Sequence, residues 1–111
     1  MKYLFTLAVA MLLANFVHAQ KVYSVGHSSQ ADVTVYVVGH SSQADLNVYQ
    51  VGHESQAGSN DGLWYFAGHS SQAKKSIYFV GHESQADLKI YMVGHSSQAG
   101  WKNSSKKHLM Y

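Results

Sequence analysis

One short unit recurs six times in this chain, and this repetition constrains the fold more than any other feature. The copies read VYSVGHSSQAD from Val22, VYVVGHSSQAD from Val35, VYQVGHESQAG from Val48, WYFAGHSSQAK from Trp64, IYFVGHESQAD from Ile77 and IYMVGHSSQAG from Ile90. A unit this short cannot bury its own apolar face, so the copies must pack against one another in an architecture built by repetition. Repetition also argues against an enzyme, because a single catalytic centre needs different residues at different places.

The first residues have the pattern of an export signal. Lys2 supplies a positive charge, residues 4–13 form an apolar run, and Ala19 is a small residue at which a signal peptidase can cut. We therefore expect a signal peptide over residues 1–19, a single β-repeat domain over residues 20–111, and a secreted or periplasmic location. The apolar run is too short for a membrane span, so we expect none after cleavage. A retained N-terminal anchor is the alternative.

The composition lacks the usual stabilising devices of small exported domains. The chain has no Cys, so it can form no disulfide, and it has no Pro. Regular packing, an unusual topology, a metal or oligomerisation must take that role. The charge is close to balance, with eight Lys opposing six acidic residues. Electrostatics therefore gives no case for a nucleic-acid partner.

Each copy begins with the pattern of a short strand. Residues 33–37 read Val-Thr-Val-Tyr-Val, which is rich in the β-branched and aromatic residues typical of strands. Alternation places Val35 and Tyr36 on opposite faces. The Tyr face is the more constant among the copies, so we expect it to face the core. It holds Tyr23, Tyr36, Tyr49, Tyr65, Tyr78 and Tyr91.

A polar corner follows each strand. Gly suits a bend or a position with positive φ, and Ser, Gln and Asp side chains can bond nearby backbone groups. The next strand begins too soon for a helix to grow, so we expect a compact corner with a small residue inside it. Those small residues are Ala31, Ala44, Ala57, Ala73, Ala86 and Ala99.

One longer step divides the copies into two groups of three. The Gly-His pairs are spaced by 13, 13, 16, 13 and 13 residues, and an insert at residues 59–62 lengthens the middle step. Three strand-and-corner sides make one triangular circuit. We therefore expect an all-β chain of six strand-and-corner repeats wound in two circuits, with copies one and four, two and five, and three and six as neighbours. An ordinary β-helix is the competing geometry.

The reiterated VYxV and SQAD segments, the mid-chain stretch over residues 60–65 and the ending over residues 99–111 together resemble the 7(1) septoil knot domain family. The resemblance covers about residues 21–111. It implies a β-rich chain wound twice around itself with its tail threaded into a deep knot. The family carries no activity that would transfer to this chain. The Gly-His pair in every corner is not a general mark of the family.

Metal binding is the sharpest chemical hypothesis, because imidazole is a common ligand of zinc, copper and nickel. Under the two-circuit geometry, His residues of paired copies would meet, with Glu54 or Glu83 beside two of the pairs. Two His and one carboxylate make an open zinc-like site. The candidate ligands are His27, His40, His53, His69, His82, His95, Glu54 and Glu83. The alternative is a structural His whose ring bonds a neighbouring corner.

Two other functions would use the same corners. Adjacent His and Ser suggest a catalytic dyad, but the final Gly of a nucleophile elbow and a third orienting group are missing, so we assign no catalytic residue. Six similar corners could instead bind a repetitive ligand such as a cell-surface glycan or a cell-wall polymer. We expect Trp64 and Trp101 to fill the core. The sequence thus favours an exported, non-enzymatic structural or binding protein with a stability based on its knot and no cofactor.

Overall fold

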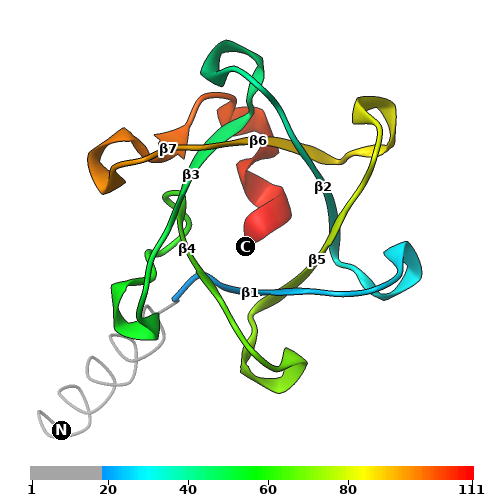
Figure 1. Ribbon diagram of the computed structural model, residues 1–111, viewed down its shortest axis with the longest axis vertical. Helices are drawn as coiled ribbons and strands as arrows, with labels where there is room; N and C mark the ends of the chain where they lie inside the picture. The colour runs from blue at the N-terminus through cyan, green and yellow to red at the C-terminus, as the bar shows by residue number, and fades with distance from the viewer. Residues whose placement is uncertain (1–18) are drawn as a thin grey trace, which may run out of the picture.

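The computed structural model describes residues 19–111 and consists of short strands joined by single 3₁₀ turns (Figure 1). The strands are β1 Lys21–Ser24, β2 Val33–Val37, β3 Leu46–Gln50, β4 Leu63–Phe66, β5 Lys75–Phe79, β6 Leu88–Met92 and β7 Gly100–Trp101. The turns are η1 Ser28–Gln30, η2 Ser41–Gln43, η3 Glu54–Gln56, η4 Ser70–Gln72, η5 Glu83–Gln85 and η6 Ser96–Gln98. A longer 3₁₀ helix, η7 Ser104–Met110, ends the chain. The predicted strands and compact corners are confirmed.

The predicted signal peptide falls almost entirely on residues 1–18, outside the described part of the chain. Within the described residues, no helix has the length and apolar character needed to cross a membrane.

Strands β1 to β6 close into an all-parallel barrel in the order β4-β1-β5-β2-β6-β3, with β3 pairing back to β4. Figure 1 shows how this order arises. The first circuit places β1, β2 and β3 at every second position, and the second circuit places β4, β5 and β6 in the gaps. The predicted two circuits and their neighbouring copies are confirmed. Each copy also pairs with a second copy of the other circuit, which the simple stacking of circuits does not give.

Equivalent positions of the repeat do not lie directly opposite each other on neighbouring strands. They are offset by two residues. Val22 of β1 lies opposite Phe66 of β4 on one side and opposite Lys75 of β5 on the other, whereas its equivalents in those copies are Trp64 and Ile77. The same displacement recurs at all six barrel pairings, so six shifts of two residues give a total of twelve. A large total displacement requires strongly tilted strands. Equivalent residues of the six copies therefore form rings around the barrel axis.

The core is built from the first residue of each copy. Six equivalent side chains form its central ring, and each has 0% exposure: Val22, Val35, Val48, Trp64, Ile77 and Ile90. Val33, Leu46 and Leu88 form the next ring toward the strand starts and are also buried. A six-stranded barrel is narrow enough for such side chains to fill it, so the interior is a packed core. Trp64 fills the core as expected, and Trp101 packs against it.

The prediction that the Tyr face points to the core is wrong. All six repeat Tyr side chains are only partly buried and lie on the outer face of the barrel. The error has a topological cause. Except between copies three and four, whose strands β3 and β4 pair directly, each connection between consecutive copies passes outside the strand that lies between them, so the outer face is covered in part as well. A constant aromatic residue on that face therefore reflects packing beneath a crossing connection.

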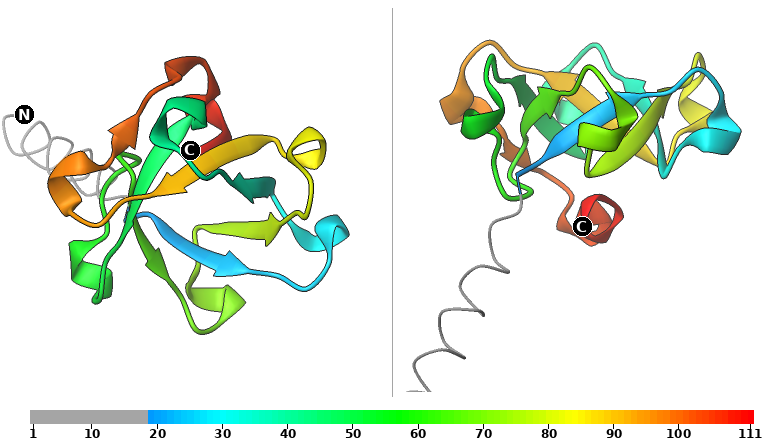
Figure 2. Two further views of the ribbon diagram at one scale, coloured as in Figure 1. Left: turned by 45° about the horizontal axis from the view of Figure 1, so that its top comes forward. Right: turned by 90° about the horizontal axis from the view of Figure 1, so that it is seen from below.

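The tail of the chain closes one end of the barrel. Strand β7 pairs antiparallel with β3, and η7 then crosses beneath the ring of strands, as the side view of Figure 2 shows. Met110 has 1% exposure and belongs to the core cluster. The backbone N–H groups of Lys102 and Asn103 both donate to the Asp45 carbonyl, over 2.8 and 2.9 Å. The end at which the strands begin is thus capped, and no segment within residues 19–111 covers the opposite end.

The six corner glycines lie at bends, which was one of the two roles predicted for them, and none of them has a positive φ. Among the described glycines, only Gly62 (φ 91°) and Gly100 (φ 150°) have one. A Cβ built on any corner glycine would meet nothing within 4 Å. A Cβ on Gly62 would lie 2.4 Å from the Asn47 carbonyl oxygen. The backbone therefore requires glycine where the two circuits join, and the corners do not.

We expect truncation of the central ring to destabilise the barrel. Ile90→Ala removes a side chain with 0% exposure and should lower the free energy of unfolding by about 2–5 kcal/mol. Val37→Ala is the matched control, because Val37 is 44% exposed and should cost less than about 1 kcal/mol. Denaturant unfolding of both variants measures the difference. Equal losses would contradict the assignment of the inner face.

We expect glycine-to-alanine substitutions to have different effects on stability at the circuit junction and at the corners. Gly62→Ala should lower the free energy of unfolding by more than about 1 kcal/mol, because alanine disfavours positive φ and its Cβ would clash with backbone. Gly39→Ala, at a corner with open space around it, should be neutral or slightly stabilising. Thermal melting of the two variants provides the comparison. A destabilising Gly39→Ala would contradict the corner geometry.

Candidate functional site

The six corners share one backbone geometry. Each His has extended backbone, with φ between −133° and −141° and ψ between 138° and 145°. The N–H of each corner Gln donates to the carbonyl of that His over 3.0–3.1 Å. The N–H of each following Ala donates over 3.1–3.2 Å to the carbonyl of the residue after the His. The Ala side chains are buried or partly buried, as predicted. The corners are therefore near-identical turns.

Aspartates attach three of the corners to the neighbouring strand. The N–H of Asp32 donates to the Ser76 carbonyl over 2.8 Å, and its carboxylate accepts the Ser76 N–H over 2.9 Å. Asp45 and Lys89 make the same pair of bonds, over 2.7 and 2.9 Å. Asp87 repeats them with Thr34, over 3.0 and 3.2 Å. These reciprocal bonds fix the point at which a corner ends and a strand begins.

The corner His and Glu side chains are exposed around the rim of the barrel. Figure 1 shows the corners as separate loops that point outward in different directions. The corner of copy one lies against the start of β5, because Asp32 bonds Ser76 there. It is not stacked on the corner of copy four. The interleaving of the circuits thus keeps equivalent His residues apart.

The described residues contain no group of three His, Cys, Asp or Glu side chains placed to hold a metal ion. The two glutamates of the proposed sites face lysines instead. Glu54 lies 3.6 Å from the Lys21 ammonium, and Glu83 lies 3.6 Å from the Lys89 ammonium. The arrangement offers isolated imidazoles. Metal binding by the corners stays a prediction, to be tested in solution.

We expect zinc to bind the corners only weakly. Single imidazoles do not complete the three or four protein ligands of a zinc site. After chelator treatment, stoichiometric zinc should leave the melting temperature of the untagged mature protein unchanged, since a ligand stabilises only as far as it binds the folded state tightly. A saturable rise would contradict this expectation if it disappears in a variant with Gln at all six corner His positions.

A ring of non-repeated side chains occupies the open end of the barrel, and the sequence interpretation did not assign it a role. These residues follow the central ring by two positions on the same strand face: Ser24, Val37, Gln50, Phe66, Phe79 and Met92. Phe66 and Met92 pack against the core, and the Phe66 ring lies 6.2 Å from that of Trp64. Val37 and Phe79 are 44% and 39% exposed. The sequence did carry a signal for this ring, because these six positions vary among otherwise similar copies.

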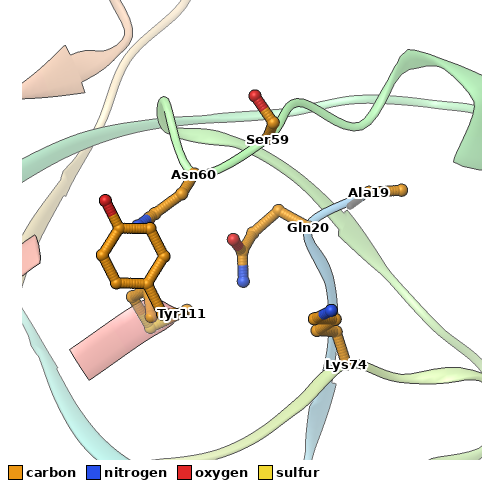
Figure 3. A pocket seen from close by; sticks show the side chains of 7 residues that line it. Ala19, Gln20, Ser59, Asn60, Lys74 and Tyr111 are labelled. Carbon is orange, nitrogen blue, oxygen red and sulfur yellow. The ribbon is translucent and has the colours of Figure 1, made fainter. Parts of the chain in front are cut away.

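A small pocket of about 160 Å³ lies at the capped end. Figure 3 shows the amide of Gln20 in this pocket, between the loop that carries Asn60 and the side chain of Lys74. Gln20 and Asn60 are 3% and 4% exposed. The Gln20 Nε2 and Asn60 Oδ1 atoms are buried without a hydrogen-bond partner. Met110 and Tyr111 of the tail complete the wall. Sequence reasoning missed this pocket because, apart from Lys74, its residues lie outside the repeated unit.

The repeat arrangement agrees with the comparison to known families. The model of the 7(1) septoil knot domain matches residues 19–102. The chain belongs to the 7(1) septoil knot domain family. The match spans all six copies and β7, which confirms the resemblance inferred from the sequence. Searches of curated proteins and of solved structures found no significant match.

Proposed function

We propose that this septoil knot domain is an exported, non-enzymatic scaffold that binds a repetitive polar polymer, such as a cell-surface glycan, through its six corners. One observation carries the proposal: six near-identical exposed turns are displayed around one closed barrel. Each turn presents an imidazole, a Ser and a Gln, which can donate and accept hydrogen bonds.

Equal corners on a fixed frame favour multivalent binding. Once one corner holds a repeating ligand, the next contact becomes intramolecular and gains from a high effective concentration. That gain needs corners at constant spacing. The reciprocal bonds of Asp32, Asp45 and Asp87 hold three corners to the barrel wall, and parallel pairing fixes the strands that carry the rest. The frame therefore suits a ligand with its own regular repeat.

The proposal includes kinetic stability based on a threaded tail. The chain has no disulfide, and an exported protein is exposed to proteolysis. Support comes from the tail itself, which bonds the Asp45 carbonyl and inserts Met110 into the core after the sixth strand. A tail that must be withdrawn before the strands separate would raise the barrier to unfolding, and resistance would then follow from a slow unfolding rate.

The binding proposal is tested by removing corners in steps. Variants with Gln in place of His at two, four and six corners are applied to insoluble cell-wall polymer and to chitin, and the bound fraction is measured. We expect graded loss, reaching about 10²-fold or more in affinity between the first and last variants. Val37→Thr is the control, because it changes the open end and leaves every corner intact.

Two outcomes would contradict multivalent binding. One is loss of all binding already in the two-corner variant, since that indicates one ordinary site. The other is full binding by the six-corner variant with its melting temperature preserved, which indicates that the corners are not the contact.

The kinetic proposal is tested by comparing two changes to the tail. Truncation after Trp101 removes the whole segment, whereas Met110→Ala removes only its buried anchor. If withdrawal of the tail limits unfolding, the truncated protein should unfold far faster than the Met110→Ala variant, as measured by dilution into denaturant. Equal unfolding rates would show that core packing by Met110 accounts for the barrier.

A further inference from the structure

Gln20 occupies a site that suits one neutral N–H group. Its backbone N–H donates to the Gly58 carbonyl over 2.7 Å, and its own carbonyl accepts the Tyr65 N–H over 3.0 Å. The residue is 3% exposed. It is therefore held between the loop after η3 and strand β4 at the capped end of the barrel, with a single carbonyl oxygen facing its backbone nitrogen.

Cleavage after Ala19 would place a charged group where the structure holds one amide N–H. The new α-ammonium of Gln20 would carry additional N–H donors and a positive charge, while the acceptor that faces it is one backbone carbonyl. Burying a charge without a partner is costly, and so is burying surplus donors. The side chain adds a second unfavourable feature, because its Nε2 atom is buried without a partner.

We propose that Gln20, once it is the N-terminal residue, is converted to pyroglutamate and that the ring occupies the pocket at the capped end. In this reaction the α-nitrogen bonds to Cδ, the bond between Cδ and Nε2 breaks, and Nε2 leaves as ammonia with one proton from the α-amine. The step is intramolecular and needs no oxidant, reductant or co-substrate. It goes beyond the binding function proposed above, and of that proposal it rests only on export with cleavage after Ala19.

One loss of ammonia removes both unfavourable features. The lactam nitrogen is neutral and carries one N–H, so no charge is buried beside the Gly58 carbonyl. The unpartnered Nε2 is gone, and Oε1 remains as the lactam carbonyl in the pocket. Cleavage also removes the Ala19 carbonyl that accepts the Lys21 N–H over 2.9 Å. Lys21 is partly exposed, so water can replace that bond.

Burial sets the order of events. Because the folded site leaves Gln20 only 3% exposed, the ring must close before the capped end assembles, and folding then encloses it. The consequence is an N-terminus that is chemically blocked and physically buried. An aminopeptidase therefore finds neither a free amine nor access to the N-terminus. This protection adds to the resistance of a chain that has no disulfides.

The modification is tested on the full chain expressed in an export-competent host. The protein is purified rapidly from the extracytoplasmic fraction, and its intact mass and N-terminal peptide are measured. We expect residues 20–111 lighter by one ammonia. A free amine on Gln20, retention of residues 1–19 or a start at any other residue would overturn the proposal. Gln20→Asn is the matched variant, because it keeps an amide but cannot close the five-membered ring.

The burial of the ring is tested separately with pyroglutamyl aminopeptidase. The folded protein should keep its N-terminal ring, and the denatured protein should lose it under the same enzyme conditions. Removal at equal rates would overturn the placement in the pocket. The Gln20→Asn variant should begin at the substituted residue with a free amine and melt at a lower temperature than the cyclised protein. An equal melting temperature would contradict the claim that the site disfavours a charged N-terminus.

Discussion

Every barrel pairing joins a strand of the first circuit to a strand of the second, and the rest of the structure depends on this constraint. Strands β1, β2 and β3 form no pairs among themselves, and neither do β4, β5 and β6. Half of the chain alone therefore has no sheet. Strands of four or five residues are individually weak. They become a stable wall because closure leaves no unpaired edge in the barrel. Such non-local pairing is expected to make folding slow.

Apart from the variable ring at the open end, the residues that break the repeat are concentrated where the circuits join and where the tail closes the barrel. Trp64 takes a position that Val or Ile holds in the other copies and adds volume to the central ring. Asn60 adopts a φ of 80°, donates its side-chain amide to the Lys107 carbonyl, and accepts the Trp101 indole N–H. Repetition thus builds the wall, whereas single residues build the capped end. This division explains why the chemistry proposed for Gln20, which no other copy can share, lies at the same end.

The corners illustrate how far a repeat can predict a site. Their existence, compactness and surface position follow from Gly, polar residues and short spacing, and the structure bears this out. The distances between the corners do not follow from these sequence features. The expectation that His27 meets His69 assumed that the circuits stack in register, whereas each strand is displaced by two residues and interleaved with the other circuit. That displacement comes from closing the barrel and has no local signal in the unit.

The prediction of which strand face lies inside the barrel was limited in the same way. Tyr23 and its equivalents are constant, yet Val22 and its equivalents form the core. Both faces of most strands are covered, one by the barrel interior and one by crossing connections, so the alternation did not reveal which face was inside. The sequence by itself determined the six strands, the six corners and the two circuits, because β-branched runs, turn residues and spacing are local properties. Only the tertiary structure decided the stagger, the inner face, the separation of the histidines and the pocket around Gln20, because each depends on how distant segments close into one barrel.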